Sequence, residues 1–100
     1  MRIVQIIDSL KVGGAERMAV NLANALVNSV AFSGLVTTRL EGQLKNAIVA
    51  DVNYLFLKRS RVVDFGALFR LRRYVRKNKI TIIHAHGSSF FFAVLLNFGK

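Results

Sequence analysis

Two hydrophobic patterns alternate along the chain. Short apolar runs at residues 2–7, 30–37, 52–57 and 80–85 are typical of buried strands. Apolar residues recur at helical spacing at 15–28 and 64–78 and in a shorter stretch at 43–50, and residues 90–98 predict a helix that is apolar on nearly every side. Polar segments at 8–14 and 38–42 predict a loop and a turn. The alternation of strand and helix predicts an α/β fold with a parallel sheet, flanking helices and right-handed crossovers.

The two longer helices are each expected to bury one face. In the first, the expected buried positions are Ala15, Met18, Ala19, Leu22 and Leu26. The second is expected to begin at the N-cap Asp64 and to end near Asn78. Its core stripe is predicted to be Ala67, Leu68, Leu71, Tyr74 and Val75. Its opposite face carries Arg70, Arg72, Arg73, Arg76 and Lys77, with Phe65 and Phe69 among them.

Length and composition set the class of the protein. The 100 residues are enough for one domain, and the absence of Cys excludes a disulfide framework and a Cys-based zinc site, which favours a cytoplasmic location. No apolar run is long enough to span a membrane. The apolar helix at 90–98 needs cover on several sides. We therefore expect residues 1–100 to be a single, incomplete domain, or to associate with a second copy through that helix.

The positive charge is concentrated in one segment. The formal net charge is +10, from 15 Lys and Arg against 5 Asp and Glu, and residues 58–79 contribute nine basic side chains and one acidic one. A basic helix face with interleaved Phe is compatible with a solvated surface or with contact to an anionic membrane. Nucleic acid is the least favoured partner, because no recognition motif or stacking platform accompanies the charge. The segment thus leaves a membrane-binding or a merely solvated face open.

The ends of the first and fourth strands bring candidate ligand groups together. These strands are neighbours in a doubly wound sheet, so Asp8, Gly13, Gly14, His86 and Ser88 are expected at one rim. The Gly pair precedes a helix, where backbone N–H groups can hold an anion, although the same pair also suits a sharp structural turn. Neither the dinucleotide pattern G-x-G-x-x-G nor a Gly-Lys-Ser/Thr phosphate loop is present.

The two histidines have different expected roles. We expect His84, one position deeper in its strand, to be a buried core residue, and His86 at the strand end to contact a ligand. Chelation of a metal by His84-x-His86 is the minor alternative, because a third ligand is needed. No metal and no cofactor are expected, and no catalytic residue is identified.

Three motifs resemble one enzyme family. Gly13-Gly14-Ala15-Glu16-Arg17 and the helix after it, the turn Glu41-Gly42-Gln43-Leu44, and the strand ending His84-Ala85-His86-Gly87 are similar in order and spacing to the N-terminal domain of family 4 retaining glycosyltransferases. The resemblance covers nearly the whole chain. It implies a Rossmann-like domain that is the incomplete N-terminal half of a GT-B fold, without the C-terminal donor domain.

The resemblance also implies a function. Such enzymes move a sugar from a nucleotide sugar to a saccharide or lipid-linked acceptor, often at the inner face of the cytoplasmic membrane. It places Gly13 and Gly14 near the donor diphosphate and His86 at the cleft, and it leaves open whether Glu16 and Arg17, which match the motif, touch ligand or hold the helix start. With Asp8 and Ser88 from the same rim, His86, Glu16 and Arg17 are the candidate residues of the acceptor cleft. A transition state shared by two domains needs both, so the 100 residues alone are expected to be inactive. The alternative is a small basic α/β domain that binds a membrane surface or nucleic acid without catalysis.

Overall fold

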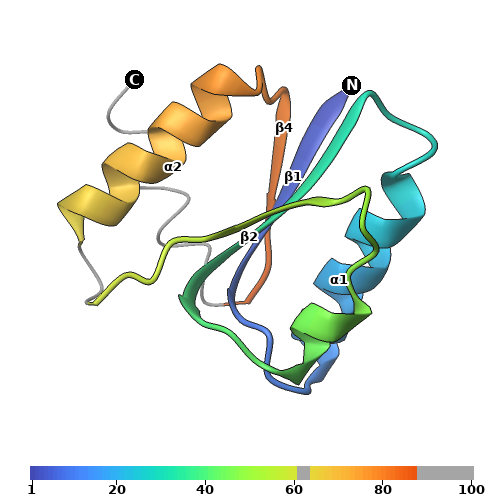
Figure 1. Ribbon diagram of the computed structural model, residues 1–100, viewed down its shortest axis with the longest axis horizontal. Coiled ribbons are helices and arrows are strands. Elements are labelled where there is room, and N and C mark those ends of the chain that lie inside the picture. Colours follow the sequence, from blue (N-terminus) through green and yellow to red (C-terminus); the bar gives the residue numbers. More distant parts are fainter. Residues whose placement is uncertain (61–63, 88–100) are drawn as a thin grey trace.

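A computed structural model describes residues 1–60 and 64–87 of the chain. The strands are β1 (Arg2–Ser9), β2 (Phe32–Leu40), β3 (Asn53–Phe56) and β4 (Ile82–Ala85). The helices are α1 (Gly14–Leu26) and α2 (Phe65–Lys77), and η1 (Gln43–Ala47) is a short 3₁₀ helix (Figure 1). Ser88 and the helix predicted at 90–98, with the self-association assigned to it, lie outside the described residues.

The four strands form one parallel sheet in the order β3-β2-β1-β4. Every neighbouring pair is parallel, with Val4 opposite Gly34 on one side and Ile83 on the other. Arg2 and Thr81 tie the start of β1 to the start of β4 through three hydrogen bonds, two that involve the Thr81 hydroxyl and one between backbone groups. The predicted α/β class and the predicted adjacency of the first and fourth strands are confirmed.

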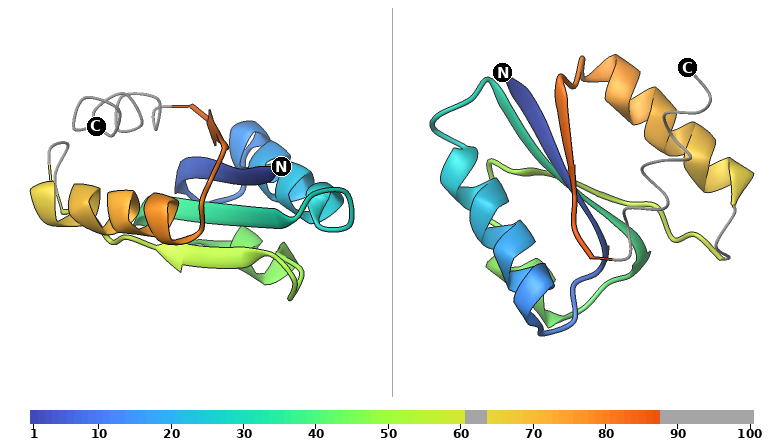
Figure 2. Two further views of the ribbon diagram at one scale, coloured as in Figure 1. Left: turned by 90° about the horizontal axis from the view of Figure 1, so that it is seen from above. Right: turned by 180° about the vertical axis from the view of Figure 1, so that it is seen from behind.

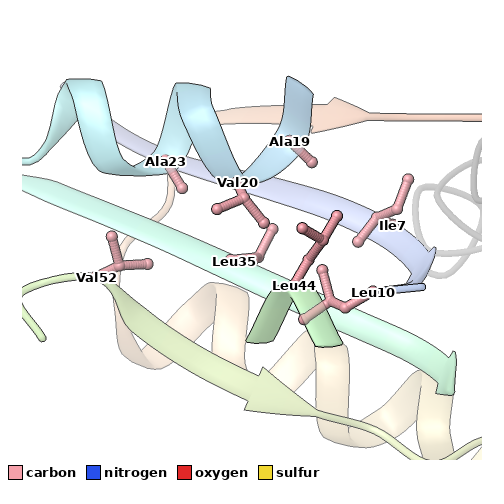
Figure 3. Close-up of a cluster of buried hydrophobic side chains, with 8 residues drawn as sticks. All are labelled: Ile7, Leu10, Ala19, Val20, Ala23, Leu35, Leu44 and Val52. Carbon is pink, nitrogen blue, oxygen red and sulfur yellow. The ribbon is translucent and has the colours of Figure 1, made fainter. Parts of the chain in front are cut away.

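The two α-helices cover opposite faces of the sheet (Figure 2). This follows from the alternation of side chains along a strand, which sends Ile6 to one face and Ile7 to the other. The cluster under α1 contains Ile7, Leu10, Ala19, Val20, Ala23, Leu35, Leu44 and Val52 (Figure 3). The cluster under α2 contains Val4, Ile6, Val36, Leu57, Ala67 and Leu71.

The buried face of α1 differs from the predicted one. Ala19, Val20 and Ala23 are buried, whereas Ala15 is exposed and Met18 is 57% exposed. Asn24, which was not expected to make a contact, lies on the same side of the helix as this buried face. Its amide nitrogen donates to the Ala47 carbonyl at 2.9 Å and its amide oxygen accepts from the Val49 N–H at 3.0 Å. These two bonds join α1 to the end of η1 and the residue after its cap, with Met18 left exposed.

The predicted α2 is confirmed in its limits and its buried stripe. Asp64 is the N-cap, and its carboxylate accepts from the Ala67 N–H at 3.1 Å and from the Ser60 N–H at 3.0 Å. The Ser60 bond, followed by the Ala67 bond, lowers the pKa of the Asp64 carboxyl. Ala67 and Leu71 are buried against the sheet. The helix end is therefore fixed by a local interaction that the sequence reveals.

The predicted turn at 38–42 begins later than expected. β2 continues to Leu40, and Thr37 and Thr38 are fully buried within it. The pairing of β1 with β2 shifts register between Ile7 and Ser9, which marks a β-bulge beside Asp8. Thr38 stays in the strand because its carbonyl accepts from the Arg59 N–H at 2.8 Å and its hydroxyl bonds to Asp8.

Candidate functional site

The carboxyl ends of the parallel strands form one edge, where the predicted site residues gather. β1 ends at Ser9, and the loop after it leads to Gly13 and the start of α1. Thr38 lies near the end of β2, Arg59 follows β3, and His86 follows β4. Ligands of open α/β sheets bind at such an edge, near the point where the strand order reverses. That point here is β1, between β2 and β4.

Asp8 is the centre of a buried polar cluster. Its Oδ1 accepts from the Thr38 hydroxyl at 2.5 Å and from the Arg59 guanidinium at 3.1 Å. Arg59 Nε also donates to the Thr38 hydroxyl oxygen at 3.3 Å. The Arg59 and Asp8 side chains are only 8% and 12% exposed. Asp8 therefore lies at the predicted rim, but its carboxylate joins the ends of β1 and β2 to the segment after β3.

His86 and His84 have the reverse of the predicted burial. His86 is buried, and its Nε2 lies 2.7 Å from Oε1 of the buried Gln5 side chain. His84 is exposed, and its ring stacks on the His86 ring with centroids 4.1 Å apart. Burial lowers the pKa of His86, and a charge on His84 lowers it further. His86 is thus favoured as a neutral imidazole that donates from Nε2 to Gln5.

The glycine pair forms the entry to α1. Gly13 is the N-cap, with an extended backbone that any residue can adopt and with no side-chain hydrogen bond to cap the helix. Its carbonyl accepts from the Arg17 N–H at 2.9 Å. A Cβ on Gly14 would meet no atom within 4 Å, so the backbone is open to approach there. The first turn of α1 therefore presents its N–H groups at the strand-end edge.

Glu16 and Arg17 have different surroundings. The Glu16 carboxylate folds back over the loop, where it accepts from the Ser9 hydroxyl at 3.4 Å and lies 2.6 Å from the place a Cβ on Gly13 would take. Arg17 is exposed and lines a hollow of about 430 Å³ together with Gly14, Met18, Asn21, Leu22 and Ala25. Glu16 thus helps to hold the helix start, while Arg17 is accessible beside it.

A backbone contact joins the turn after β2 to the glycine loop. A Cβ on Gly42 would lie 2.5 Å from the carbonyl carbon and oxygen of Leu10 and from the nitrogen of Lys11. The Leu44 N–H donates to the same Leu10 carbonyl at 3.0 Å. The sequence predicted the turn at residues 41–44 as a family motif, without a role.

The outer face of α2 is cationic with two exposed rings. Phe65 is 67% exposed and Phe69 63% exposed, and Arg73, Arg76 and Lys77 are exposed around them. Arg72 is half-buried. Phe69, Arg72, Arg73, Arg76 and Lys77 line a hollow of about 560 Å³. Arg70 is exposed as well, but its guanidinium donates to the Leu57 carbonyl and so also ties α2 to the end of β3.

Three residues of the edge were missed by sequence reasoning. Arg59 was counted with the cationic surface, and Thr38 and Gln5 were read as turn and strand residues. A polar residue inside an apolar strand, as Gln5 is in β1, is the one signal that could have indicated a buried partner. Within residues 1–60 and 64–87, no group of three His, Cys, Asp or Glu side chains is placed to hold a metal ion. No helix in this part of the chain is long and apolar enough to cross a membrane.

A comparison with protein families gives a match over most of the chain. The model described as Glycosyltransferase Family 4 matches residues 12–100. No curated protein and no solved structure was found to match. The match begins at the glycine loop and includes β2, β3, α2 and β4, which build most of the strand-end edge.

Proposed function

Because the chain belongs to glycosyltransferase family 4, we propose that it acts in the transfer of a sugar from a nucleotide sugar to a saccharide or lipid-linked acceptor, with retained configuration and as the N-terminal part of a GT-B enzyme. The observation that carries this proposal is the entry to α1. Its first turn has no side-chain cap from Gly13, and Gly14 beside it is open to approach. The N–H groups at a helix start and the helix dipole favour a diphosphate at that place, and the Glu16 carboxylate, which lies beside Gly13, would have to turn away from the bound anion.

The proposed roles follow from exposure and charge. The backbone at Gly13 and Gly14 binds the donor diphosphate and stabilises the negative charge that develops on it as the sugar leaves. Arg17 is accessible one helical turn away and contacts substrate. Asp8, Glu16 and His86 each already bond to a neighbouring side chain. Their proposed role is therefore to shape the acceptor cleft rather than to bind the acceptor directly. Ser88, proposed for the same cleft, lies outside the described residues.

Amide NMR of the 100-residue chain tests the diphosphate site. Addition of uridine diphosphate or inorganic pyrophosphate is expected to shift the resonances of Gly14, Ala15 and Glu16. The amide of Gly66 is the internal control, because Asp64 already caps that helix. Equal shifts at both helix starts, or none at Gly14, would contradict the proposal.

A turnover assay tests the expectation of inactivity. The purified chain, mixed with a nucleotide sugar and an acceptor, is expected to release no nucleoside diphosphate above the uncatalysed rate, because transition-state stabilisation requires groups from a second domain. Sustained turnover would show that these residues complete a site by themselves.

The cationic face of α2 supports a second proposed role, contact with the inner face of the cytoplasmic membrane. Phe65 and Phe69 are exposed on the helix that carries the exposed Arg73 and Arg76, rather than buried in the core. Rings that enter the lipid boundary beside cations that meet anionic headgroups are the arrangement of an interfacial helix. A peripheral position at a membrane would bring a lipid-linked acceptor close to the strand-end edge.

Vesicle flotation tests the membrane role. The variant Arg72→Ala, Arg73→Ala and Arg76→Ala is expected to weaken binding to anionic vesicles about 100-fold, from about 1 kcal/mol for each cation near the surface. The matched control removes three cations elsewhere, with Lys11→Ala, Arg17→Ala and Arg39→Ala. Equal loss in both variants would indicate an effect of net charge alone. A parallel titration with duplex DNA is expected to show no binding that depends on these arginines.

A further inference from the structure

The turn at Glu41-Gly42-Gln43-Leu44 is in direct contact with the loop that precedes α1. Gly42 has φ −154 and ψ −173, an extended conformation that any residue can adopt. The need for glycine at position 42 comes from lack of space, because a Cβ there would lie 2.5 Å from three backbone atoms of Leu10 and Lys11. Backbone atoms cannot move aside as a flexible side chain can. A side chain at 42 would therefore displace residues 10–11 or the turn itself.

Leu44 fixes the same contact from the other side. Its N–H donates to the Leu10 carbonyl at 3.0 Å, the oxygen against which Gly42 packs. Leu10 is fully buried and Leu44 is 7% exposed, and both belong to the cluster that includes Ala19 and Val20 of α1 (Figure 3). One carbonyl group of the loop is thus held by a hydrogen bond and by close packing, next to the helix that the loop enters.

The outer end of the turn is anchored to β3. The Tyr54 hydroxyl donates to the Glu41 carboxylate at 2.8 Å, and Lys45 forms an ion pair with it at 3.2 Å. The Tyr54 bond is the larger cause of the lowered pKa of Glu41, with Lys45 contributing. The Lys45 ammonium lies 5.6 Å from the centre of the Tyr54 ring. β3 therefore supports one end of the turn, while the other end supports residues 10–11.

We propose that Gly42 and Leu44 are positioning residues for the diphosphate site, because they set the place of the loop that carries Gly13 and Gly14. This inference rests on the proposed function. The turn touches no ligand itself. It acts through the Leu10 carbonyl, three residues before Gly13, so that a displaced loop points the first N–H groups of α1 in another direction. Preorganisation of this kind lowers the cost of binding, since the loop is already in place before the anion arrives.

Gly42→Ala is the test, with Gly66→Ala as the matched control. A Cβ at Gly66 would meet only the Asp64 carboxylate, at an ordinary 3.4 Å. Inorganic pyrophosphate is titrated into the wild-type chain and both variants, with the Gly14 amide shift and thermal unfolding as readouts. Gly42→Ala is expected to raise the Kd at least fivefold and to move the ligand-free resonances of residues 11–14. Gly66→Ala is expected to change the Kd less than twofold.

The outcomes separate the two proposals. If the wild-type chain binds pyrophosphate and a folded Gly42→Ala variant binds it equally well, the positioning role is wrong and the proposed function stands. If the wild-type chain shows no shift at Gly14, the diphosphate site itself is wrong and this inference fails with it.

A second variant keeps the test decisive if Gly42→Ala does not fold. Tyr54→Phe removes the hydroxyl that holds Glu41 and retains the ring. It is expected to raise the Kd at least threefold while the chain stays folded, whereas a change of less than twofold, as in Gly66→Ala, would overturn the inference.

Discussion

Arg59 and Arg73 come from the same cationic stretch of sequence and differ in everything but charge. The Arg59 side chain is 8% exposed and bonds to Asp8 and Thr38 at the carboxyl edge of the sheet. Arg73 is exposed on the outer face of α2, between Phe69 and Lys77 in the lining of one hollow. The edge holds its charges paired and shielded from water, while the helix face leaves them exposed. The formal net charge of the chain therefore does not tell which of its cations are paired and which are exposed.

Replacement of each arginine by methionine should separate the two regions most strongly. Arg59→Met leaves the Asp8 carboxylate without its guanidinium partner in a nearly buried site, and about 3 kcal/mol of unfolding free energy should be lost. Arg73→Met should change that free energy by less than about 0.5 kcal/mol. Urea unfolding measures both. The double variant Asp8→Leu with Arg59→Met should recover part of the loss, and no recovery would argue against the ion pair as the cause.

The exposed rings should show the opposite pattern, with a smaller effect. Phe65→Ala together with Phe69→Ala should weaken binding to anionic vesicles by about 2 kcal/mol, or roughly thirtyfold, because about that much apolar transfer is lost. Both rings are more than 60% exposed, so the unfolding free energy should change little. Flotation and urea unfolding on the same sample measure the two effects. A large loss of stability would mean that the rings pack against the protein.

Acid should weaken the edge but not the helix face. The pKa of His86 is lowered from its usual 6.5 by burial and then by His84, so the unfolded chain takes up the proton at a higher pH than the folded one. The contribution of the neutral ring is complete above the unfolded pKa, and it is lost as the pH falls from there toward the lowered folded pKa. Arginine stays charged throughout this range, so the cationic face of α2 adds no such dependence, and the N-cap Asp64, whose pKa is lowered from 3.8, contributes only at still lower pH.

Thermal unfolding at a series of pH values measures this effect. His86→Asn should flatten the decline in stability, while His84→Asn should leave most of it, because burial is the larger cause. Equally steep declines in His86→Asn and in the wild-type chain would assign the effect to another group.

Local signals predicted the helix face, and contacts between distant segments decided the edge. The start of α2 follows from Asp64, which accepts a hydrogen bond from Ala67 three residues later, and a sequence shows such a pair directly. The pair of Asp8 and Arg59 spans 51 positions, so no local pattern contains it. Asn24 of α1 likewise bonds to partners that lie 23 and 25 residues away. The burial of the two histidines was predicted the wrong way round, because the prediction did not include Gln5 as a partner for His86.

The position of β1 has a consequence for the order of folding during synthesis. β1 pairs with β2 on one side and with β4 on the other, and Thr81 bonds to Arg2 across 79 positions. As the ribosome extends the chain, the β1–α1–β2 unit can assemble first, because its contacts are close in sequence. One edge of the most buried strand then stays unpaired until residues 82–85 have emerged, and a separation of this size slows folding. A chaperone that shields that edge would act on the nascent chain between the synthesis of β2 and that of β4.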